Sequence, residues 1–151
     1  MEGLLSHEAF TGVGWEPACG DGHISRFFPG IMCSDIRHDH IAGEGGVDFL
    51  LERHQVDFIV TNPPYSLAQQ FVEHALECAD KIAMLLRIQF LESKSRGLLF
   101  KKNPPARIHV FSDRVNCDPS SASGRGGMMC FAWFIWDKQY QGPTVLDWIG
   151  T

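Results

Sequence analysis

A short glycine turn with acidic neighbours is the first feature of this sequence that could bind a ligand. Glu16 lies in the apolar run 13–17, and Gly20, Asp21 and Gly22 follow it, just before a segment with helical character. Glycines let a backbone approach a ligand closely, and a helix beginning there points its free N–H groups at the ligand. The turn lacks the Gly-x-Gly-x-x-Gly pattern of dinucleotide sites, and its carboxylates favour a cationic ligand over a pyrophosphate.

Two further carboxylates lie where later strands are predicted to end. Asp35 follows the strand predicted over 31–34 and stands 19 residues after Glu16, where a doubly wound fold places the carboxylate that binds ribose hydroxyls. Asp48 and Phe49 belong to a brief strand predicted over 47–50 and could hold an adenine ring by its amine and its face. Each carboxylate alone could be an ordinary surface charge, but carboxylates at successive strand ends favour a ligand site.

The segment Thr61-Asn62-Pro63-Pro64-Tyr65 places an amide, two prolines and an aromatic ring after another predicted strand, over 57–61. Two successive prolines cannot donate ladder hydrogen bonds, so the strand must end there. The segment could be a simple strand terminator. Its place downstream of the glycine turn, at the end of another strand, favours a chemical role instead.

The elements that would position these residues alternate along the chain. Short apolar runs separated by helix-like segments predict a parallel sheet with helices on both faces. The predicted strands are 13–17, 31–34, 47–50, 57–61, 81–86, 107–111 and 128–136. The predicted helices are 23–28, 67–76 with Ser66 or a neighbour as its cap, and 92–102, while 112–127 is a mobile loop and 140–143 a turn before the tail.

Length and composition restrict the class of protein. A chain of 151 residues with 44% hydrophobic residues and a net charge of −5 predicts one folded domain over 1–151, and excludes a disordered chain and a membrane-spanning one. The N-terminus lacks the basic start of a secretion signal, which predicts a cytoplasmic protein. Five cysteines without a Cys-x-x-Cys pair predict reduced thiols. His38 and His40 have no third ligand nearby, so no metal site is predicted.

Charge is distributed unevenly along the chain. Residues 1–80 carry a net charge of −10, whereas residues 81–125 carry +6. The sequence pI of about 5.7 argues against a nucleic-acid-binding domain, but it conceals this basic segment. The asymmetry fits an acidic half that binds a cationic or hydroxyl-bearing ligand and a basic stretch that meets a polyanion, although on charge alone a solvated helix face is the simpler explanation of the basic stretch.

The segment 61–65 resembles the catalytic Asn/Asp-Pro-Pro-Tyr/Phe/Trp motif of the S-adenosylmethionine-dependent amino-methyltransferases. Residues 15–22, Trp-Glu-Pro-Ala-Cys-Gly-Asp-Gly, resemble the cofactor motif of that family, in the expected order and spacing. The likeness is greatest to the small DNA adenine-N6 methyltransferases of phages and prophages, and continues through 83–87, 90–92 and 131–136. It implies a phage or prophage origin and a Rossmann-like class I methyltransferase fold. That fold would be α/β, a mostly parallel seven-stranded sheet with an antiparallel last strand and helices on both faces.

The resemblance also implies roles for individual residues, with S-adenosylmethionine as cofactor. The side-chain oxygen of Asn62 and the carbonyl of Pro63 would accept the two hydrogens of the target amine, drawing its nitrogen toward tetrahedral geometry, and Tyr65 would stack on the flipped base. The implied catalytic residues are Asn62, Pro63, Pro64 and Tyr65. The implied cofactor contacts are Glu16, Pro17, Ala18, Gly20, Asp21, Gly22, Asp35, Ile36, Asp48, Phe49 and Asn62.

With that resemblance the basic segment becomes a candidate for phosphate contact, and the expected partner is a nucleic acid, DNA before RNA. The predicted substrate contacts are Tyr65, Arg87, Lys94, Arg96, Lys101, Lys102, Arg114 and Arg125. Since 151 residues leave no room for a target-recognition domain, we expect a loose or very short sequence preference, or a homodimer whose second subunit supplies DNA contacts. Methylation of RNA adenine or of a protein glutamine amide, and a non-catalytic binding module, remain open alternatives.

Overall fold

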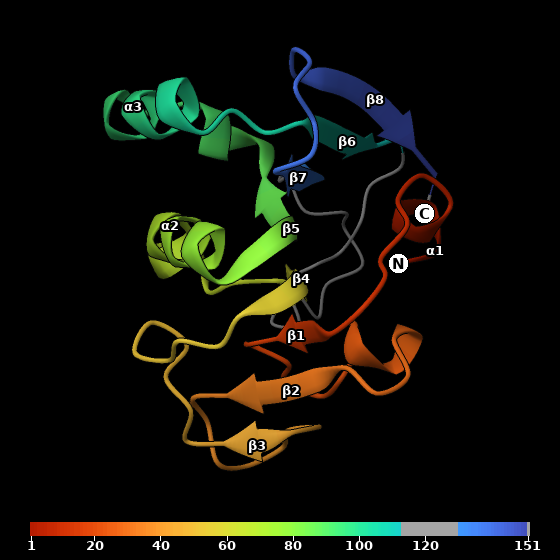
Figure 1. The fold of residues 1–151 in the computed structure, drawn as a ribbon, viewed down its shortest axis with the longest axis vertical. Helices are drawn as coiled ribbons and strands as arrows, with labels where there is room; N and C mark the ends of the chain where they lie inside the picture. The colour runs from red at the N-terminus through yellow and green to blue at the C-terminus, as the bar shows by residue number, and fades with distance from the viewer. Residues whose placement is uncertain (113–129, 151) are drawn as a thin grey trace, which may run out of the picture.

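In the computed structural model, which describes residues 1–112 and 130–150, eight strands form one sheet in the order β3-β2-β1-β4-β5-β7-β6-β8 (Figure 1). The strands are Gly14–Glu16 (β1), Met32–Asp35 (β2), Glu44–Gly45 (β3), Val56–Thr61 (β4), Ala79–Arg87 (β5), Arg107–Phe111 (β6), Phe131–Asp137 (β7) and Val145–Ile149 (β8). The helices are Glu2–Leu5 (α1), Ala68–Cys78 (α2) and Lys94–Lys102 (α3), with 3-10 turns at Ser25–Phe27 (η1), Tyr65–Leu67 (η2) and Ile88–Leu91 (η3).

All strands except β7 run in the same direction. The pairs along β3-β2-β1-β4-β5 are parallel, β7 is antiparallel to both β5 and β6, and β8 is parallel to β6. The predicted mostly parallel sheet is therefore confirmed. The antiparallel strand is not the last one, however, because β8 adds an eighth strand that the sequence analysis treated as an irregular tail.

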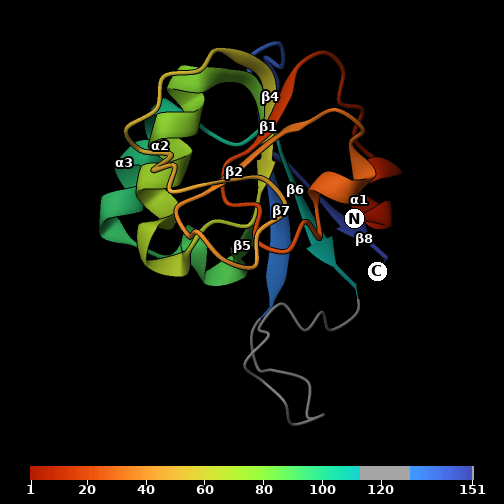
Figure 2. The same cartoon turned by 90° about the horizontal axis from the view of Figure 1, so that it is seen from below.

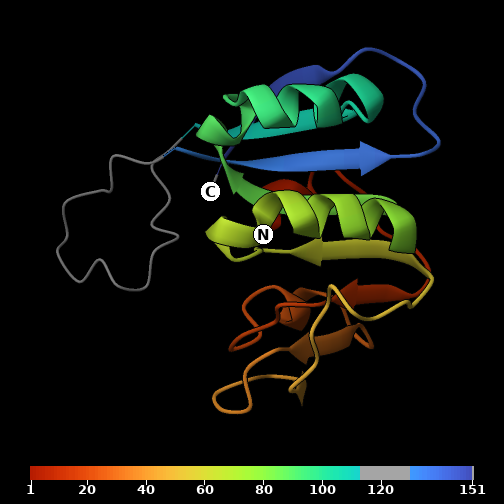
Figure 3. The ribbon, with the colours of Figure 1, turned by 90° about the vertical axis from the view of Figure 1, so that its left-hand side faces the viewer.

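Helices lie on both faces of the sheet, as predicted, but unequally (Figures 2 and 3). On one face, α2 and α3 cover a core that includes Trp15, Phe71 and Phe134. On the other, α1 and the segment around η1 cover Phe58 and Phe131. The apolar spacing of residues 67–76 thus predicted α2 correctly, although no side-chain hydrogen bond caps it and Ser66 lies within η2.

Three local predictions differ from the structure. The helix expected over 23–28 is only the turn η1, because Pro29 and Gly30 follow before a longer helix could form. The strand expected over 47–50 is a turn, in which the backbone N–H of Leu50 donates to Asp48 Oδ1 (3.0 Å). Strand pairing with β2 is made instead by Glu44 and Gly45. The loop expected over 112–127 lies almost wholly outside the described residues, as does the start of the predicted strand 128–136.

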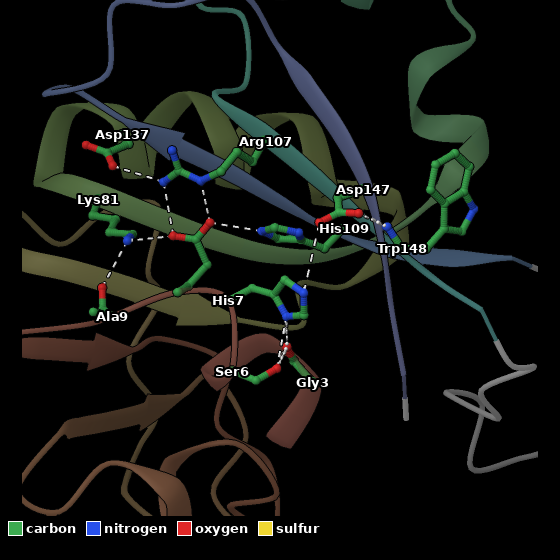
Figure 4. Close-up of polar contacts among 11 residues, drawn as sticks. Gly3, Ser6, His7, Ala9, Lys81, Arg107, His109, Asp137, Asp147 and Trp148 are labelled. Atoms are coloured by element: carbon green, nitrogen blue, oxygen red, sulfur yellow. Dashed lines mark hydrogen bonds and ion pairs between the residues drawn. The ribbon is translucent and has the colours of Figure 1, made fainter.

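A buried ionic cluster ties the N-terminal segment to the sheet (Figure 4). Glu8, only 4% exposed, accepts hydrogen bonds from Arg107, from Lys81 (2.7 Å) and from His109 (2.9 Å). Arg107 also pairs with Asp137 (3.0 Å). Burial by itself would raise the pKa of Glu8, but these donors outweigh it and hold the pKa well below its usual range. The cluster therefore joins β5, β6 and β7 to residues that precede β1.

Neutralising this carboxylate should destabilise the fold. We expect Glu8→Gln to lower the free energy of unfolding by about 3–5 kcal/mol near neutral pH, since it leaves Lys81 without its buried counter-charge and Arg107 with Asp137 alone. Because the folded-state pKa of Glu8 is lowered, its contribution is present above the ordinary glutamate pKa and is lost as pH falls below it. Urea denaturation of the wild type and of Glu8→Gln, near neutral pH and at acidic pH, measures the difference in the free energy of unfolding. This difference should shrink at acidic pH.

The matched control is Asp80→Asn, which removes one carboxylate from an exposed pair with Lys138 (3.2 Å). An exposed pair contributes about 0–1 kcal/mol. Equal destabilisation by both substitutions would contradict the structural role of Glu8.

Candidate active site

The carboxyl ends of β1, β2, β4 and β5 meet at one edge of the sheet, because these strands are parallel. The glycine turn follows β1, Asp35 ends β2, and the segment 62–65 follows β4. Figure 3 shows η2 and η3 at the same end of the sheet. The structure thus brings together the two motifs that the sequence analysis selected, at the position where open parallel sheets bind ligands.

The glycine turn has the backbone conformation that only glycine adopts without strain. Gly20 has φ +49° and Gly22 has φ +78°. The backbone N–H of Gly20 donates to Asp35 Oδ2 (2.9 Å), and its carbonyl accepts from the N–H of Ala42 (2.8 Å). A Cβ at position 22 would lie 2.7 Å from the Cβ of Ala42. The positive φ therefore favours glycine at both positions, and close packing against the loop after β2 requires it at position 22.

Asp35 anchors this turn and also engages a residue that the sequence analysis missed. Its Oδ1 accepts from the backbone N–H of Arg37 (2.9 Å) and from Arg37 Nε (3.2 Å). Burial would raise the pKa of Asp35, but the N–H groups of Arg37 and Gly20 outweigh it and lower the pKa. Asp35 is thus an ionised carboxylate beside the turn, and Arg37 is the cation that faces it.

Glu16 is the most unusual charged residue of the site. It is 1% exposed, and within residues 1–112 and 130–150 its Oε2 has no hydrogen-bond partner. Burial raises its pKa to about 7, hydrogen bonds with Ser25 oppose the shift, and the nearby charge of Asp35 adds to it. A buried carboxylate in this state gains most from a cationic ligand, since a nearby positive charge stabilises its ionised form.

The other predicted cofactor contacts differ in exposure. Asp21 and Ile36 are exposed, Pro17 is buried and Ala18 is half-buried at the start of the turn. Phe49 is 2% exposed, and its ring packs against Trp15, Phe71 and His74 at centroid distances of 4.7–5.0 Å. Its ring therefore forms part of the core, which corrects the expectation that it offers an open face to a ligand.

The segment after β4 leaves a hydrogen-bond acceptor unused. Asn62 Oδ1 is buried and has no partner among the described residues. Pro63 is buried, whereas Pro64 and Tyr65 are exposed, and the carbonyl of Pro64 accepts from the N–H of Leu67 (2.9 Å) to begin η2. Buried amide oxygens are normally satisfied, so this one is available to a donor from a ligand.

The ring of Tyr65 lies against two side chains from the neighbouring strands. The guanidinium carbon of Arg87 is 3.9 Å from the centre of the ring, and the Phe131 ring is 6.0 Å away at an interplanar angle of 40°. Arg87 Nε is buried and lacks a hydrogen-bond partner in the part of the chain that the structure describes. Arg87 therefore lies at the motif itself rather than in a peripheral loop.

The basic segment does not gather at this edge. Helix α3 leads from the carboxyl end of β5 back toward the amino end of β6 (Figure 3), so its first residue, Lys94, is nearer the carboxyl edge than its last two, Lys101 and Lys102. Arg96 donates to the carbonyls of Phe90 and Glu92 (2.8 Å for the latter). The basic residues of the segment therefore do not form one continuous surface at this edge within the described residues, and their contact with phosphates stays a prediction.

Two other basic residues of the segment, Lys81 and Arg107, are engaged by Glu8. Arg114 and Arg125, which the sequence analysis included, lie outside the described residues. Of the basic residues from 81 to 112, Arg87, Lys94 and Arg96 lie toward the carboxyl edge and outside the Glu8 cluster, and the guanidinium of Arg96 is bound by backbone carbonyls.

Residues 1–112 and 130–150 contain neither a group of three or more potential metal ligands nor a helix long and apolar enough to span a membrane.

Comparison with known proteins supports the same class of fold. The chain is 30% identical to an "Uncharacterized adenine-specific methylase" of Mycoplasma pneumoniae, over 60% of this chain and 26% of that protein. The chain thus spans about a quarter of the length of the curated relative it matches. No protein-family model matches it.

Solved structures resemble most of the chain. A protein assigned as an RNA methyltransferase in Pyrococcus horikoshii superposes with a TM-score of 0.64 at 14% identity, over 84% of this chain and 74% of that one. The 23S rRNA methyltransferase ErmE superposes with a TM-score of 0.57 at 13% identity, over 93% of this chain and 69% of that one. A chain of a type I restriction–modification system superposes with a TM-score of 0.58 at 12% identity, over 95% of this chain and 42% of that one.

The fold is that of a class I methyltransferase. Its strand order and its single antiparallel strand β7 support the fold predicted from the sequence, with β8 as an addition.

The buried charge of Glu16 should reduce stability at alkaline pH. Between its ordinary pKa of 4.5 and the folded-state value of about 7, the folded protein retains a proton that the unfolded chain has released, so stability falls as pH rises through this range. We expect Glu16→Gln to be more stable than the wild type by about 2–3 kcal/mol near pH 8, and the difference to shrink toward about pH 5. Chemical denaturation of the wild type and of Glu16→Gln between about pH 5 and pH 8 measures this difference in the free energy of unfolding.

Glu44→Gln, which changes an exposed carboxylate, is the control and should leave the pH profile unchanged. A pH-independent effect of Glu16→Gln would contradict the assigned pKa.

Proposed function

We propose that this protein is an S-adenosylmethionine-dependent methyltransferase that acts on the N6 amine of adenine in nucleic acid, with DNA as the leading substrate. The observation that carries the proposal is the buried, unused acceptor Asn62 Oδ1, which begins an Asn-Pro-Pro-Tyr segment at the carboxyl end of β4. The class I methyltransferase fold and the similarity to an adenine-specific methylase support it.

The residues of the glycine turn fit the proposed cofactor. The unpaired Oε2 of Glu16 suits a ligand that carries positive charge, and Gly20 and Gly22 hold the turn beside it in a backbone conformation that other residues adopt only with strain. Asp35 offers a carboxylate for hydroxyl groups, with acceptor capacity beyond the bonds it already makes. When bound, S-adenosylmethionine supplies an electrophilic methyl group.

The segment after β4 supplies groups that prepare the amine. An exocyclic amine on an aromatic ring is a poor nucleophile, because its lone pair is delocalised into the ring. Asn62 Oδ1 and the carbonyl of Pro63 would each accept one of its hydrogens, which draws the nitrogen toward tetrahedral geometry and localises the pair. Tyr65, 39% exposed, would hold the plane of the base by stacking.

The choice of nucleic acid rests on the relatives and on local charge. One structural neighbour is an rRNA methyltransferase and another belongs to a restriction–modification system, so the neighbours support a nucleic acid without favouring DNA or RNA. Arg87 and Lys94 would provide positive charge at the edge where the amine is bound. The described residues contain both the glycine turn and the catalytic segment, which supports a single catalytic domain. A homodimer remains a prediction.

Methyl transfer from labelled cofactor should be measured on double-stranded DNA, single-stranded DNA, RNA and a protein lysate. We expect incorporation into nucleic acid, and we expect Asn62→Ala to lower kcat by about a hundredfold or more while cofactor affinity stays within about threefold. The reason is that the amide oxygen acts on the amine more than on the cofactor.

Asn103→Ala is the matched control, since Asn103 caps the far end of α3. Incorporation only into protein would favour a glutamine-amide substrate, and no incorporation would favour a non-catalytic module. Full activity of Asn62→Ala would contradict the mechanism.

Binding of nucleic acid should depend on Lys94 but not on the lysines at the far end of α3. We expect Lys94→Ala to reduce the slope of log affinity against log salt by about one, the effect of one phosphate contact, and the double variant Lys101→Ala with Lys102→Ala to leave the slope unchanged. Fluorescence anisotropy with a labelled oligonucleotide at several salt concentrations measures both. A larger effect of the double variant would contradict this prediction and would indicate that the far end of α3 contacts phosphates.

A further inference from the structure

We propose that Arg87 is a positioning residue for the reaction: its guanidinium fixes the orientation of the Tyr65 ring, and through that ring the orientation of the target base. The proposal rests on the proposed function, because it assumes that Tyr65 stacks on a planar substrate. It assigns to Arg87 a role that the general prediction of phosphate contact does not contain.

The ladder between β5 and β7 sets the place of this guanidinium. Arg87 ends β5 directly opposite Phe131, which begins β7, and the next bond runs from the N–H of Ile88 to the carbonyl of Cys130 (2.9 Å). Opposite residues of an antiparallel pair point their side chains to the same face. Arg87 and Phe131 therefore form a paired surface at the edge of the sheet, against which the ring of Tyr65 lies.

The contact between Arg87 and Tyr65 is a close stack. The guanidinium carbon lies 3.9 Å from the ring centre, a distance at which a planar cation is attracted to the face of an aromatic ring. The Phe131 ring at 6.0 Å contacts Tyr65 from the same ladder. Tyr65 begins the short turn η2 and is 39% exposed. The contacts with Arg87 and Phe131 nevertheless restrict the rotation of its ring.

The buried Nε of Arg87 indicates that the stack is kept at a cost. An arginine side chain can usually turn its N–H groups to water, yet this donor is buried and, among the described residues, unsatisfied. A planar guanidinium is needed for this arrangement, since a lysine ammonium is a compact charge that does not cover an aromatic face in the same way. Arginine and lysine are therefore not interchangeable at position 87.

Ring orientation matters because Asn62 and Tyr65 belong to one short segment, with Pro63 and Pro64 between them. A base stacked on a tilted ring would carry its amine away from Asn62 Oδ1, and small misplacements of reacting groups reduce rate strongly. Loss of the stack should thus lower kcat more than it weakens binding. A residue that only contacts phosphate would instead change affinity and its salt dependence.

The first measurement is independent of any substrate. The chain has 2 tyrosines, so incorporation of 3-fluorotyrosine gives two fluorine NMR signals, which Tyr65→Phe assigns. We expect Arg87→Lys and Arg87→Ala to shift the Tyr65 signal and leave that of Tyr140 unchanged, because Tyr140 lies near Arg107 instead. Arg53→Lys, at an exposed arginine that pairs with Glu77, is the matched control and should move neither signal.

The second measurement is steady-state methyl transfer to the preferred nucleic acid. We expect Arg87→Lys, which keeps the charge, to lower kcat by about tenfold or more while KM for the nucleic acid changes by less than about threefold. In a double-mutant cycle, Arg87→Ala should cost much less in the Tyr65→Ala background than in the wild type, since Arg87 acts through Tyr65.

An unshifted Tyr65 signal in Arg87→Lys would overturn the proposal, and so would a shifted signal with wild-type kcat. A change in KM and salt slope without a change in kcat would also overturn it, in favour of phosphate contact. These outcomes leave the proposed function intact. Absence of transfer by the wild-type protein on every nucleic acid would overturn the proposed function and the positioning role together.

Discussion

β1 pairs in parallel with β2 and β4, and β4 pairs in parallel with β5, so the loops that follow these strands all leave the sheet at one edge. The glycine turn, the Asn62–Tyr65 segment and Arg87 each follow or end one of these strands. They are distant in sequence and meet only because the strands run in one direction. Antiparallel pairing of β7 then adds Phe131 to the same edge, directly opposite Arg87.

The buried carboxylate of Glu8 contrasts with two buried acceptors near the carboxyl edge. The carboxylate of Glu8 is saturated by Lys81, Arg107 and His109, and such a group holds elements together. Glu16 Oε2 and Asn62 Oδ1 are equally buried but lack partners among the described residues. Unsatisfied acceptors reduce stability, and their position at the carboxyl edge is understandable if ligands satisfy them.

Sequence patterns predicted the central strands well and the edge strands poorly. The strand over 107–111 matches β6, which pairs with β7 and β8 and whose apolar residues are buried (Ile108) or half-buried (Val110 and Phe111). β8 was missed although four of its five residues are apolar, because they do not alternate with polar ones; only Ile149 is buried, and the strand forms by pairing with β6. β3 was misplaced because a turn around Asp48 competes with extended structure. Edge strands depend on pairing partners that local sequence does not contain.

The sequence by itself determined which residues stand at strand ends: Glu16 and the glycines after one apolar run, and Asn62 to Tyr65 after another. Local rules suffice for this, since two successive prolines cannot donate ladder hydrogen bonds and the Gly-Asp-Gly segment favours a turn. Only the tertiary structure decided which charges remain for a ligand. Lys81 and Arg107 are engaged by Glu8, Lys101 and Lys102 lie at the far end of α3, and Arg87 stacks on Tyr65. The net charge of a segment counts its residues, whereas electrostatic interactions depend on their separation in space.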